Sequence, residues 1–276
     1  DFGLLDVDNV HKIYWEKVGN KKGIPILVLH GGPGAGGNIS LRRFFDPNFY
    51  NIIIFDQRGA GRSSPAACIQ NNTTQDLVKD IEKLRIFLKI DQWIIFGGSW
   101  GSSLSLAYSQ EYPKNIINMV LRGVFLCRKK EIQWFLKGIK NIFPEYWDRF
   151  NSFLPKEERK DLLLSYYNRL IAKDSKIYEK AAISWARYEA NCSTFLPNAS
   201  VTEEFLDVQM ALNLARIEAH YFINNLFLEE GQLLNNASKI KDIKGFIIQG
   251  RYDAICPAES AYDLANAWPN SNLRII

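Results

Sequence analysis

The stretch WIIFGGSWGSSLSLAYSQEYP, residues 93–113, decides the fold of this chain. It opens with an apolar run rich in isoleucine, which is typical of a strand buried on both faces. Glycines flank Ser99 in GGSWG, and the residues after them are typical of a helix that ends before Pro113. A serine on a tight turn between such a strand and helix exposes its hydroxyl, and the glycines make room for the turn. We therefore predict that Ser99 is a nucleophile; the alternative is a turn serine that caps the helix.

Five further apolar runs lie along the chain. They are residues 26–29, 52–55, 119–121, 246–249 and 273–276. None of these runs alternates polar with apolar residues, so we expect a mostly parallel sheet with helices on both faces. A helical pattern over 74–89, with leucine or isoleucine at every third or fourth position, supports this α/β alternation.

The strand-like runs stop between residues 126 and 238. This segment is rich in Trp, Tyr, Phe, Lys and Glu, and its pattern is helical. We interpret it as a helical cap inserted over the strand ends, with residues 1–125 and 239–276 forming the core. No internal repeat or low-complexity linker separates cap from core, so we expect them to fold as one unit.

Composition and charge restrict the classes of function. The 276 residues contain 34 Lys and Arg against 30 Asp and Glu, without basic runs, so we expect neither a nucleic acid nor a membrane surface as partner. No segment approaches the ~20 consecutive apolar residues of a membrane span, and no signal-peptide pattern opens the chain, which predicts a cytoplasmic protein. The four cysteines form no CxxC pair, which argues against a disulfide framework or a zinc site. The sequence leaves the oligomeric state open.

A second glycine-rich loop, HGGPG at residues 30–34, follows the run at 26–29. Residues without side chains let backbone N–H groups point into a site, and an oxyanion needs two such donors. We predict that these donors are the N–H groups of Gly32 and of Trp100, the residue after the predicted nucleophile. The two loops thus support each other, because each supplies half of one oxyanion hole.

The same glycines also match a rival motif. Residues 32–37 fit GxGxxG after a strand, and Asp56 ends the next apolar run about where a dinucleotide-binding fold has its ribose-binding acid. Pro33 and the glycines disfavour a helix at this point, and the rival motif leaves Ser99 without a role. We therefore prefer the oxyanion loop, and we interpret Asp56 as the partner of Arg58 in an ion pair that braces it.

Asp253 follows a late strand-like run, within the sequence GRYD. An acid at the end of such a strand can orient a catalytic imidazole, and triads of this architecture run Ser, then Asp or Glu, then His. The histidines of the chain, His11, His30 and His220, all precede Asp253, and each fits a structural role. We expect the catalytic base beyond Ile276, in a sequence trimmed at its end; the alternative is an inactive enzyme.

Six motifs of the chain resemble the proline iminopeptidases, a family of α/β-hydrolases. In chain order they are HGGPG, DQRGAGRS, GGSWGS, LRGVF, ARIEAHYF and GRYDAICP. The resemblance covers nearly the whole chain, the cap included. It implies an α/β-hydrolase core with a helical cap, and a serine aminopeptidase that needs no metal or cofactor and removes proline from peptides with a free N-terminus. It also implies Ser99 as nucleophile, Asp253 as triad acid and a histidine shortly after the strand at 273–276.

The resemblance further implies a substrate site under the cap. Glu218 and Glu189 match two glutamates that bind the α-ammonium group of the substrate. Phe125 and Phe222 match aromatic residues that line the proline pocket, whereas Leu136 stands where the family often has tyrosine. Two carboxylates desolvated beneath a cap require a cation to offset their repulsion, so such a site rejects internal peptide bonds. Glu218 and Phe222 are four residues apart and share a helix face.

Two other functions fit the same residues. An esterase or amidase of this architecture without amine recognition would hydrolyse N-acetylated substrates equally well. A catalytically inactive α/β-hydrolase scaffold that binds a ligand or partner under its cap would have no histidine after Ile276.

Overall fold

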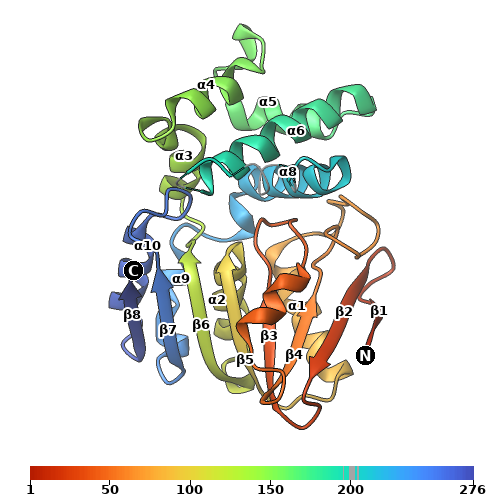
Figure 1. The fold of residues 1–276 in the computed structure, drawn as a ribbon, viewed down its shortest axis with the longest axis vertical. Helices are drawn as coiled ribbons and strands as arrows, with labels where there is room; N and C mark the ends of the chain where they lie inside the picture. Colours follow the sequence, from red (N-terminus) through yellow and green to blue (C-terminus); the bar gives the residue numbers. More distant parts are fainter. Residues whose placement is uncertain (195, 199–202, 204) are drawn as a thin grey trace.

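The computed structural model describes residues 1–194, 196–198, 203 and 205–276. A sheet of eight strands forms the lower half of the molecule in Figure 1, in the order β1-β2-β4-β3-β5-β6-β7-β8. The strands are β1 (Phe2–Asp6), β2 (Lys12–Gly19), β3 (Ile24–Leu29), β4 (Tyr50–Phe55), β5 (Trp93–Ser99), β6 (Ile116–Val124), β7 (Lys244–Gln249) and β8 (Ser271–Ile275). All six predicted apolar runs lie in strands, β3 to β8, which pair in parallel.

Strands β1 and β2 are additional to the predicted ones: β1 pairs antiparallel with β2, and β2 pairs antiparallel with β4. In β2 the buried apolar residues Ile13 and Trp15 alternate with Tyr14, which is partly exposed, and Glu16, which is buried but charged. A strand with one polar or partly exposed face has no continuous apolar run, so the pattern that predicted β3 to β8 does not include β1 and β2.

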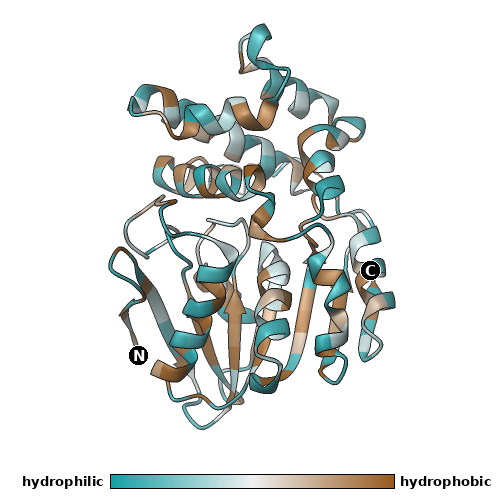
Figure 2. Ribbon diagram, turned by 180° about the vertical axis from the view of Figure 1, so that it is seen from behind, coloured by the Kyte–Doolittle hydropathy of each residue, from teal (hydrophilic) through white to brown (hydrophobic). Residues whose placement is uncertain are grey.

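The central strands are buried on both faces, as predicted. In β3, Leu27 and Leu29 belong to the larger hydrophobic cluster, whereas Ile26 and Val28 belong to a smaller cluster on the opposite face. Figure 2 shows these strands as hydrophobic along most of their length. The larger cluster continues into the cap, so that cap and core share one hydrophobic interior.

Three helices cover the core: α1 (Thr74–Phe87), α2 (Trp100–Glu111) and α10 (Ala258–Ala267). Helix α1 confirms the pattern predicted over 74–89, and it begins with a capping box between Thr73 and Asp76. Its end is marked by Lys89, whose φ of 55° is left-handed. Helix α2 starts directly after Ser99 and packs against β5, as the sequence predicts.

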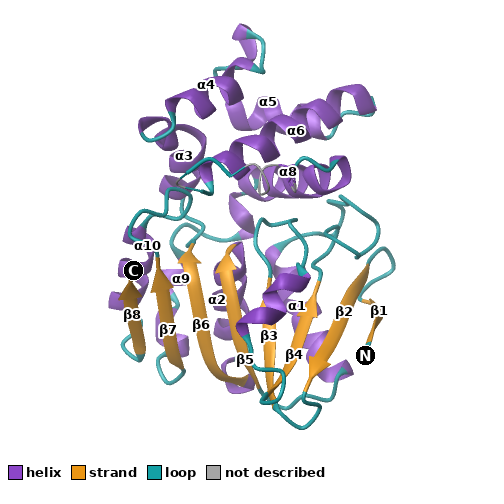
Figure 3. Cartoon of the chain, in the orientation of Figure 1, coloured by secondary structure: helices purple, strands orange, loops and turns teal. Residues whose placement is uncertain are grey.

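The secondary structure that the described residues of the cap form is helical, and the cap lies over the carboxyl ends of the strands (Figure 3). Its helices are α3 (Lys129–Lys137), α4 (Pro144–Ser152), α5 (Leu162–Leu170), α6 (Ser175–Cys192) and α8 (Val208–Ile223). The short helices of the chain are η1 (Ile39–Phe44), η2 (Pro113–Asn115), η3 (Gly138–Asn141), η4 (Lys156–Glu158), η5 (Asn225–Phe227), α9 (Gln232–Asn235) and η6 (Ala237–Ile240).

The limits of the cap, residues 126 to 238, stay a prediction. The Gln75 side-chain amide donates to the carbonyl oxygen of Phe227 at 2.6 Å, and that of Gln110 donates to the carbonyl oxygen of Leu233 at 2.7 Å. Because both donors lie on core helices, we propose that the cap ends near Asn224, where α8 ends.

The close packing of α2 against the sheet leads to a prediction about Gly101, the second residue of this helix. A Cβ atom at this position would overlap with the backbone carbonyl of Leu29 on β3. We expect Gly101→Ala to lower the free energy of unfolding by about 3 kcal/mol, because backbone atoms cannot move aside. In the control Gly3→Ala the new Cβ has no neighbour closer than 3.5 Å, and we expect a change within about 0.5 kcal/mol. Urea unfolding of both variants measures the difference, and equal stabilities would contradict the prediction.

Candidate active site

Ser99 lies at the junction of β5 and α2, with φ 54° and ψ −128°. A non-glycine residue in this region carries strain of about 1–3 kcal/mol, which is common at functional sites. The Ser99 side chain makes no capping hydrogen bond to α2, so the alternative that it serves as a helix cap is wrong. The neighbour found for its hydroxyl among the described residues is the Cys256 thiol, with 3.9 Å between Oγ and Sγ. The geometry is that of a nucleophile elbow.

The predicted oxyanion loop lies directly against Ser99. A Cβ built on Gly31 would be 3.4 Å from the Ser99 Cβ and 3.8 Å from its Oγ. Gly32 has a φ of 103°, which glycine adopts readily. Its N–H donates none of the backbone hydrogen bonds found in the described part of the chain, and Trp100, as the first residue of α2, has no acceptor within the helix. Both predicted donors are therefore available to an oxyanion.

His30 and Gln57 brace this loop. The Gln57 N–H donates to His30 Nε2 at 2.9 Å, so the imidazole carries its proton on Nδ1, 2.9 Å from the Gly31 carbonyl oxygen. The Gln57 side chain donates to the His30 carbonyl and accepts from the indole N–H of Trp100 at 2.8 Å. The predicted structural role of His30 is confirmed. The role of Gln57 was not predicted; the signal in the sequence was a polar residue two positions after a buried strand.

The predicted ion pair between Asp56 and Arg58 is wrong. Asp56 pairs instead with Arg62, at 2.8 Å between Oδ2 and Nε, and accepts the N–H of Gly37 at 2.8 Å. Arg58 points away from this loop and pairs with Asp80 at 2.6 Å. Asp56 still holds the segment after the oxyanion loop, but through a partner six residues away.

The dinucleotide-binding alternative also fails. Only the 3-10 helix η1 follows the glycines, so the long helix that this motif requires is absent from the described residues there. Asp56 is fully buried and engaged with Arg62 and Gly37, which leaves it no access to a ribose.

Asp253 follows β7 and lines the same cavity as Ser99. Its Oδ1 accepts the N–H groups of Cys256 at 2.8 Å and Ile255 at 3.1 Å. Burial raises the pKa of Asp253, and these N–H groups, together with the charge of Arg122, act against that rise. The position predicted for the triad acid is thus occupied by a partly buried, hydrogen-bonded carboxylate.

The three histidines are engaged elsewhere. His11 Nε2 is 2.7 Å from the Gln70 carbonyl oxygen, and His220 Nε2 is 3.0 Å from that of Asn72. None of the three lines the cavity of Ser99 and Asp253 in the part of the chain that is described. A catalytic histidine beyond Ile276 stays a prediction.

The cavity that contains Ser99 has a volume of about 860 Å³ and lies between the strand ends and the cap. Its wall includes Glu189 on α6 and Trp134 on α3, which the sequence analysis did not single out as a wall residue. The indole N–H of Trp134 donates to the carbonyl oxygen of Ala254 at 2.7 Å, and so ties the cap to the loop of Asp253. The predicted nucleophile, the predicted triad acid and one predicted ammonium ligand therefore line one cavity.

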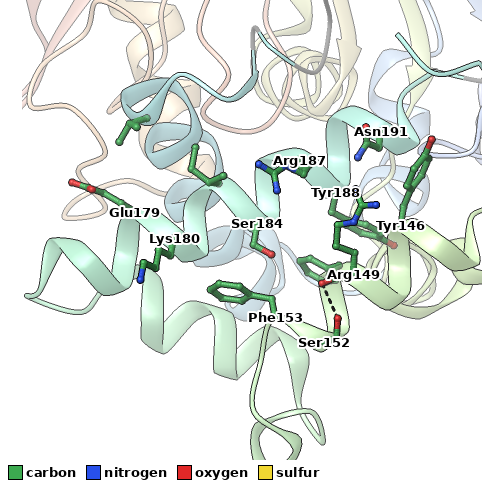
Figure 4. Close-up of a pocket in the computed structure, with 13 residues that line it drawn as sticks. Tyr146, Arg149, Ser152, Phe153, Glu179, Lys180, Ser184, Arg187, Tyr188 and Asn191 are labelled. Atoms are coloured by element: carbon green, nitrogen blue, oxygen red, sulfur yellow. Dashed lines mark hydrogen bonds between the residues drawn. The ribbon is translucent and has the colours of Figure 1, made fainter. Parts of the chain in front are cut away.

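A second cavity, of about 560 Å³, lies within the cap (Figure 4). Helices α4 and α6 form it, with Arg149 and Arg187 among its lining residues. It contains none of the predicted site residues, so we do not assign the active site to it.

Glu189 and Glu218 form a buried carboxyl pair under the cap. Glu218, on α8, is 3% exposed and accepts the indole N–H of Trp185 at 2.6 Å. Glu189 Oε2 is buried and has no hydrogen-bond partner among the residues that the structure describes. Burial raises the pKa of Glu189 to about 7, and burial together with the charge of Glu189 raises the pKa of Glu218 well above its usual value. In the described part of the chain the pair has no ion-pair partner, and it is therefore suited to bind a cation.

This pair predicts a change of stability with pH. A carboxyl whose folded-state pKa exceeds the unfolded value of 4.5 stabilises the fold below that value, and this stabilisation disappears as the pH rises to about 7. We expect the free energy of unfolding of the wild type, relative to the double variant Glu189→Gln/Glu218→Gln, to fall by on the order of 3 kcal/mol between pH 4.5 and 8.

The comparison with the double variant removes a competing effect. Burial lowers the pKa of His30 and His220, so these residues raise stability as the pH approaches 6.5 in both proteins. Urea unfolding at four pH values measures the relative stability, and a constant or rising difference would refute the prediction.

Phe125 and Phe222, the predicted walls of the proline pocket, are buried side by side. Their ring centroids are 6.3 Å apart, and Phe222 also contacts Phe135, at 5.6 Å, and Trp185, at 6.2 Å. Glu218 and Phe222 lie on α8 as predicted, and Trp185 contacts both. The aromatic cluster therefore adjoins the carboxyl pair, although neither Phe125 nor Phe222 is among the described residues that line the larger cavity.

Within the ranges that the structure describes, no group of three or more His, Cys, Asp or Glu residues could hold a metal ion. No helix among the same residues is long and apolar enough to cross a membrane.

Comparison with known proteins assigns the chain to a family. The model of the alpha/beta hydrolase fold matches residues 24–276. A proline iminopeptidase from Arabidopsis thaliana is 50% identical over 99% of this chain and 73% of its own length, and one from Xylella fastidiosa is 47% identical over 100% of this chain and 88% of its own.

Two solved structures have a similar fold. A proline iminopeptidase from Mycobacterium smegmatis gives a TM-score of 0.63 at 16% identity, over 100% of this chain and 90% of that one. The esterase RhEst1 from a Rhodococcus species gives 0.67 at 16% identity, over 99% and 89%. The fold and the elbow at Ser99 define an α/β-hydrolase. Within this class, the chain belongs to the family of the proline iminopeptidases.

Proposed function

We propose that the protein is a serine aminopeptidase that releases proline from peptides with a free N-terminus. The observation that carries this proposal is the carboxyl pair of Glu189 and Glu218 under the cap, in which one buried Glu189 oxygen has no partner among the described residues. Because Glu189 and Ser99 line the same cavity, an ammonium bound to Glu189 would occupy the cavity that contains the nucleophile. A blocked amine would leave both carboxylates unpaired.

The chemistry begins at Ser99. Its Oγ attacks the carbonyl carbon of the terminal proline, and its proton passes to a histidine base, which we place beyond Ile276. The N–H groups of Gly32 and Trp100 bind the oxyanion of the tetrahedral intermediate. The base then protonates the leaving amine, and an acyl-enzyme remains on Ser99. Water hydrolyses this ester by the same steps and releases free proline.

The remaining residues support these steps. Asp253 orients the base and stabilises its charged form. The aromatic rings of Phe125 and Phe222 offer the pyrrolidine ring an apolar wall. The substrates are peptides with a free N-terminal proline.

Hydrolysis of two reporters tests the proposal, using the protein with its natural sequence after Ile276. We expect prolinamide with a free amine to be hydrolysed and the N-acetylated reporter to react at least 100-fold more slowly. Equal turnover of both reporters would replace the proposal with a general esterase or amidase. No turnover of either, together with no labelling of Ser99 by a fluorophosphonate, would indicate an inactive scaffold.

A further inference from the structure

Gln249, the last residue of β7, is completely buried. Its side-chain Oε1 accepts the N–H of Val124, at the end of β6, at 2.9 Å. Its Nε2 donates to the carbonyl oxygen of Cys256 at 2.8 Å and to Oδ2 of Asp253 at 3.2 Å. One side-chain amide thus connects the ends of two strands to the proposed catalytic acid.

The two oxygens of Asp253 have different surroundings. Oδ1 is occupied by the N–H groups of Ile255 and Cys256, whereas Gln249 is the donor to Oδ2 in the described structure. A Cβ built on Gly123 would be 3.5 Å from Oδ2 and 3.7 Å from the Ser99 nitrogen, so Oδ2 and the Ser99 backbone both lie beside Gly123. Oδ2 is therefore the oxygen left for the imidazole of the base.

We propose that Gln249 is a positioning residue, whose amide holds the Asp253 carboxylate in the orientation and charge state that the base requires. The inference rests on the proposed function, in which Asp253 is the triad acid. A glutamine suits this role because it donates to Asp253 and accepts from Val124 at once. A carboxylate at position 249 could only accept, and an aliphatic side chain could do neither.

Few charged groups face Asp253. Arg122 on β6 is the cation whose charge lowers the pKa of this carboxyl. The Cys256 thiol stays neutral because burial raises its pKa well above the usual value. Glu189 from the cap and Arg251 from the loop of Asp253 line the same cavity. Because the Cys256 thiol is neutral, it does not compete electrostatically with Gln249. The hydrogen bond from Gln249 to Oδ2 is an interaction with the carboxylate that a single substitution can remove.

Two variants separate positioning from mere packing. Gln249→Met keeps the length of the side chain but donates nothing, so we expect kcat/KM to fall about tenfold through kcat, with KM unchanged. Gln249→Glu can donate only while its carboxyl is protonated; once ionised, it faces Asp253 as a like charge. We expect its kcat/KM relative to the wild type to fall from about one third at pH 5.5 to about one hundredth at pH 8.5.

The control is Gln110→Glu, a second buried glutamine, whose side chain donates to a backbone carbonyl at 2.7 Å far from the site. Its activity relative to the wild type should not depend on pH. The full-length proteins are assayed between pH 5.5 and 8.5, below their unfolding temperatures. If kcat/KM of Gln249→Glu relative to the wild type does not change with pH, or changes only as much as that of the control, the proposal is overturned. If Gln249→Glu does not fold, an unchanged kcat in Gln249→Met overturns it equally.

A second readout separates this inference from the proposed function. Phosphonylation of Ser99 by a fluorophosphonate uses the same base and acid but needs no prolyl substrate. If prolinamide is not hydrolysed, the aminopeptidase proposal fails while the labelling rates still decide the role of Gln249. If the labelling rate of Gln249→Glu relative to the wild type falls between pH 5.5 and 8.5, as predicted for kcat/KM, positioning is supported. If this relative rate does not depend on pH, positioning is refuted.

Discussion

Replacement of Ser99 by alanine is expected to lower kcat for prolinamide by a factor on the order of 10⁶, because removal of the nucleophile leaves only the oxyanion hole and substrate binding. The fold should survive, since the Ser99 side chain makes no capping bond and the backbone turn is held by the glycines around it. Steady-state assays of purified wild type and Ser99→Ala measure the loss. Fluorophosphonate labelling should disappear together with activity.

The matched control is Ser102→Ala, three residues further along α2. The Ser102 hydroxyl donates to the Ser99 carbonyl oxygen at 2.7 Å and accepts the Phe125 N–H at 3.1 Å, so this variant removes a hydroxyl near the site without removing the nucleophile. We expect it to keep most of its activity. If Ser99→Ala retains more than about one percent of wild-type kcat, the assignment of the nucleophile is wrong.

Replacement of Glu218 by glutamine is expected to lower kcat/KM for the free-amine reporter by on the order of 10² to 10³, because it removes one of two buried charges that pair with the ammonium. The loss equals about 3–4 kcal/mol of transition-state stabilisation. The amide oxygen of the new side chain can still accept the Trp185 indole N–H, so the variant isolates the charge from the packing. Residual turnover of the N-acetylated reporter should not decrease.

Glu179→Gln is the control for this charge change. Glu179 lies on α6, as Glu189 does, but lines the second cavity in the cap. It should leave both reporters unaffected. If Glu218→Gln lowers the turnover of both reporters equally, or of neither, amine recognition by this pair is ruled out.

Much of the fold follows from local patterns. The run before Ser99, its glycines and the helix after it predict β5, the elbow and α2, because each of these depends on residues close in sequence. The apolar runs predict β3 to β8 for the same reason. β1 and β2 escaped prediction because one of their faces is exposed, which gives an alternating pattern over few residues.

Part of the candidate site also follows from local patterns, and part does not. Ser99 and Asp253 could be predicted from motifs at strand ends, since the carboxyl ends of parallel strands converge on one edge of the sheet. The ion-pair partner of Asp56 could not be predicted, because Arg58 and Arg62 are both close to Asp56 in sequence. The tertiary structure decides between them by placing Asp80 on α1 beside Arg58.

The sequence by itself determined the class of fold, the nucleophile turn and the order of the motifs, because these depend on local backbone preferences and on the spacing of apolar residues. Only the tertiary structure decided that Glu189 and Glu218 meet, that one of their oxygens has no partner within the described ranges, and that Gln249 reaches Asp253. The reason is that desolvation and charge pairing depend on distances between residues far apart in the chain, which no local pattern encodes.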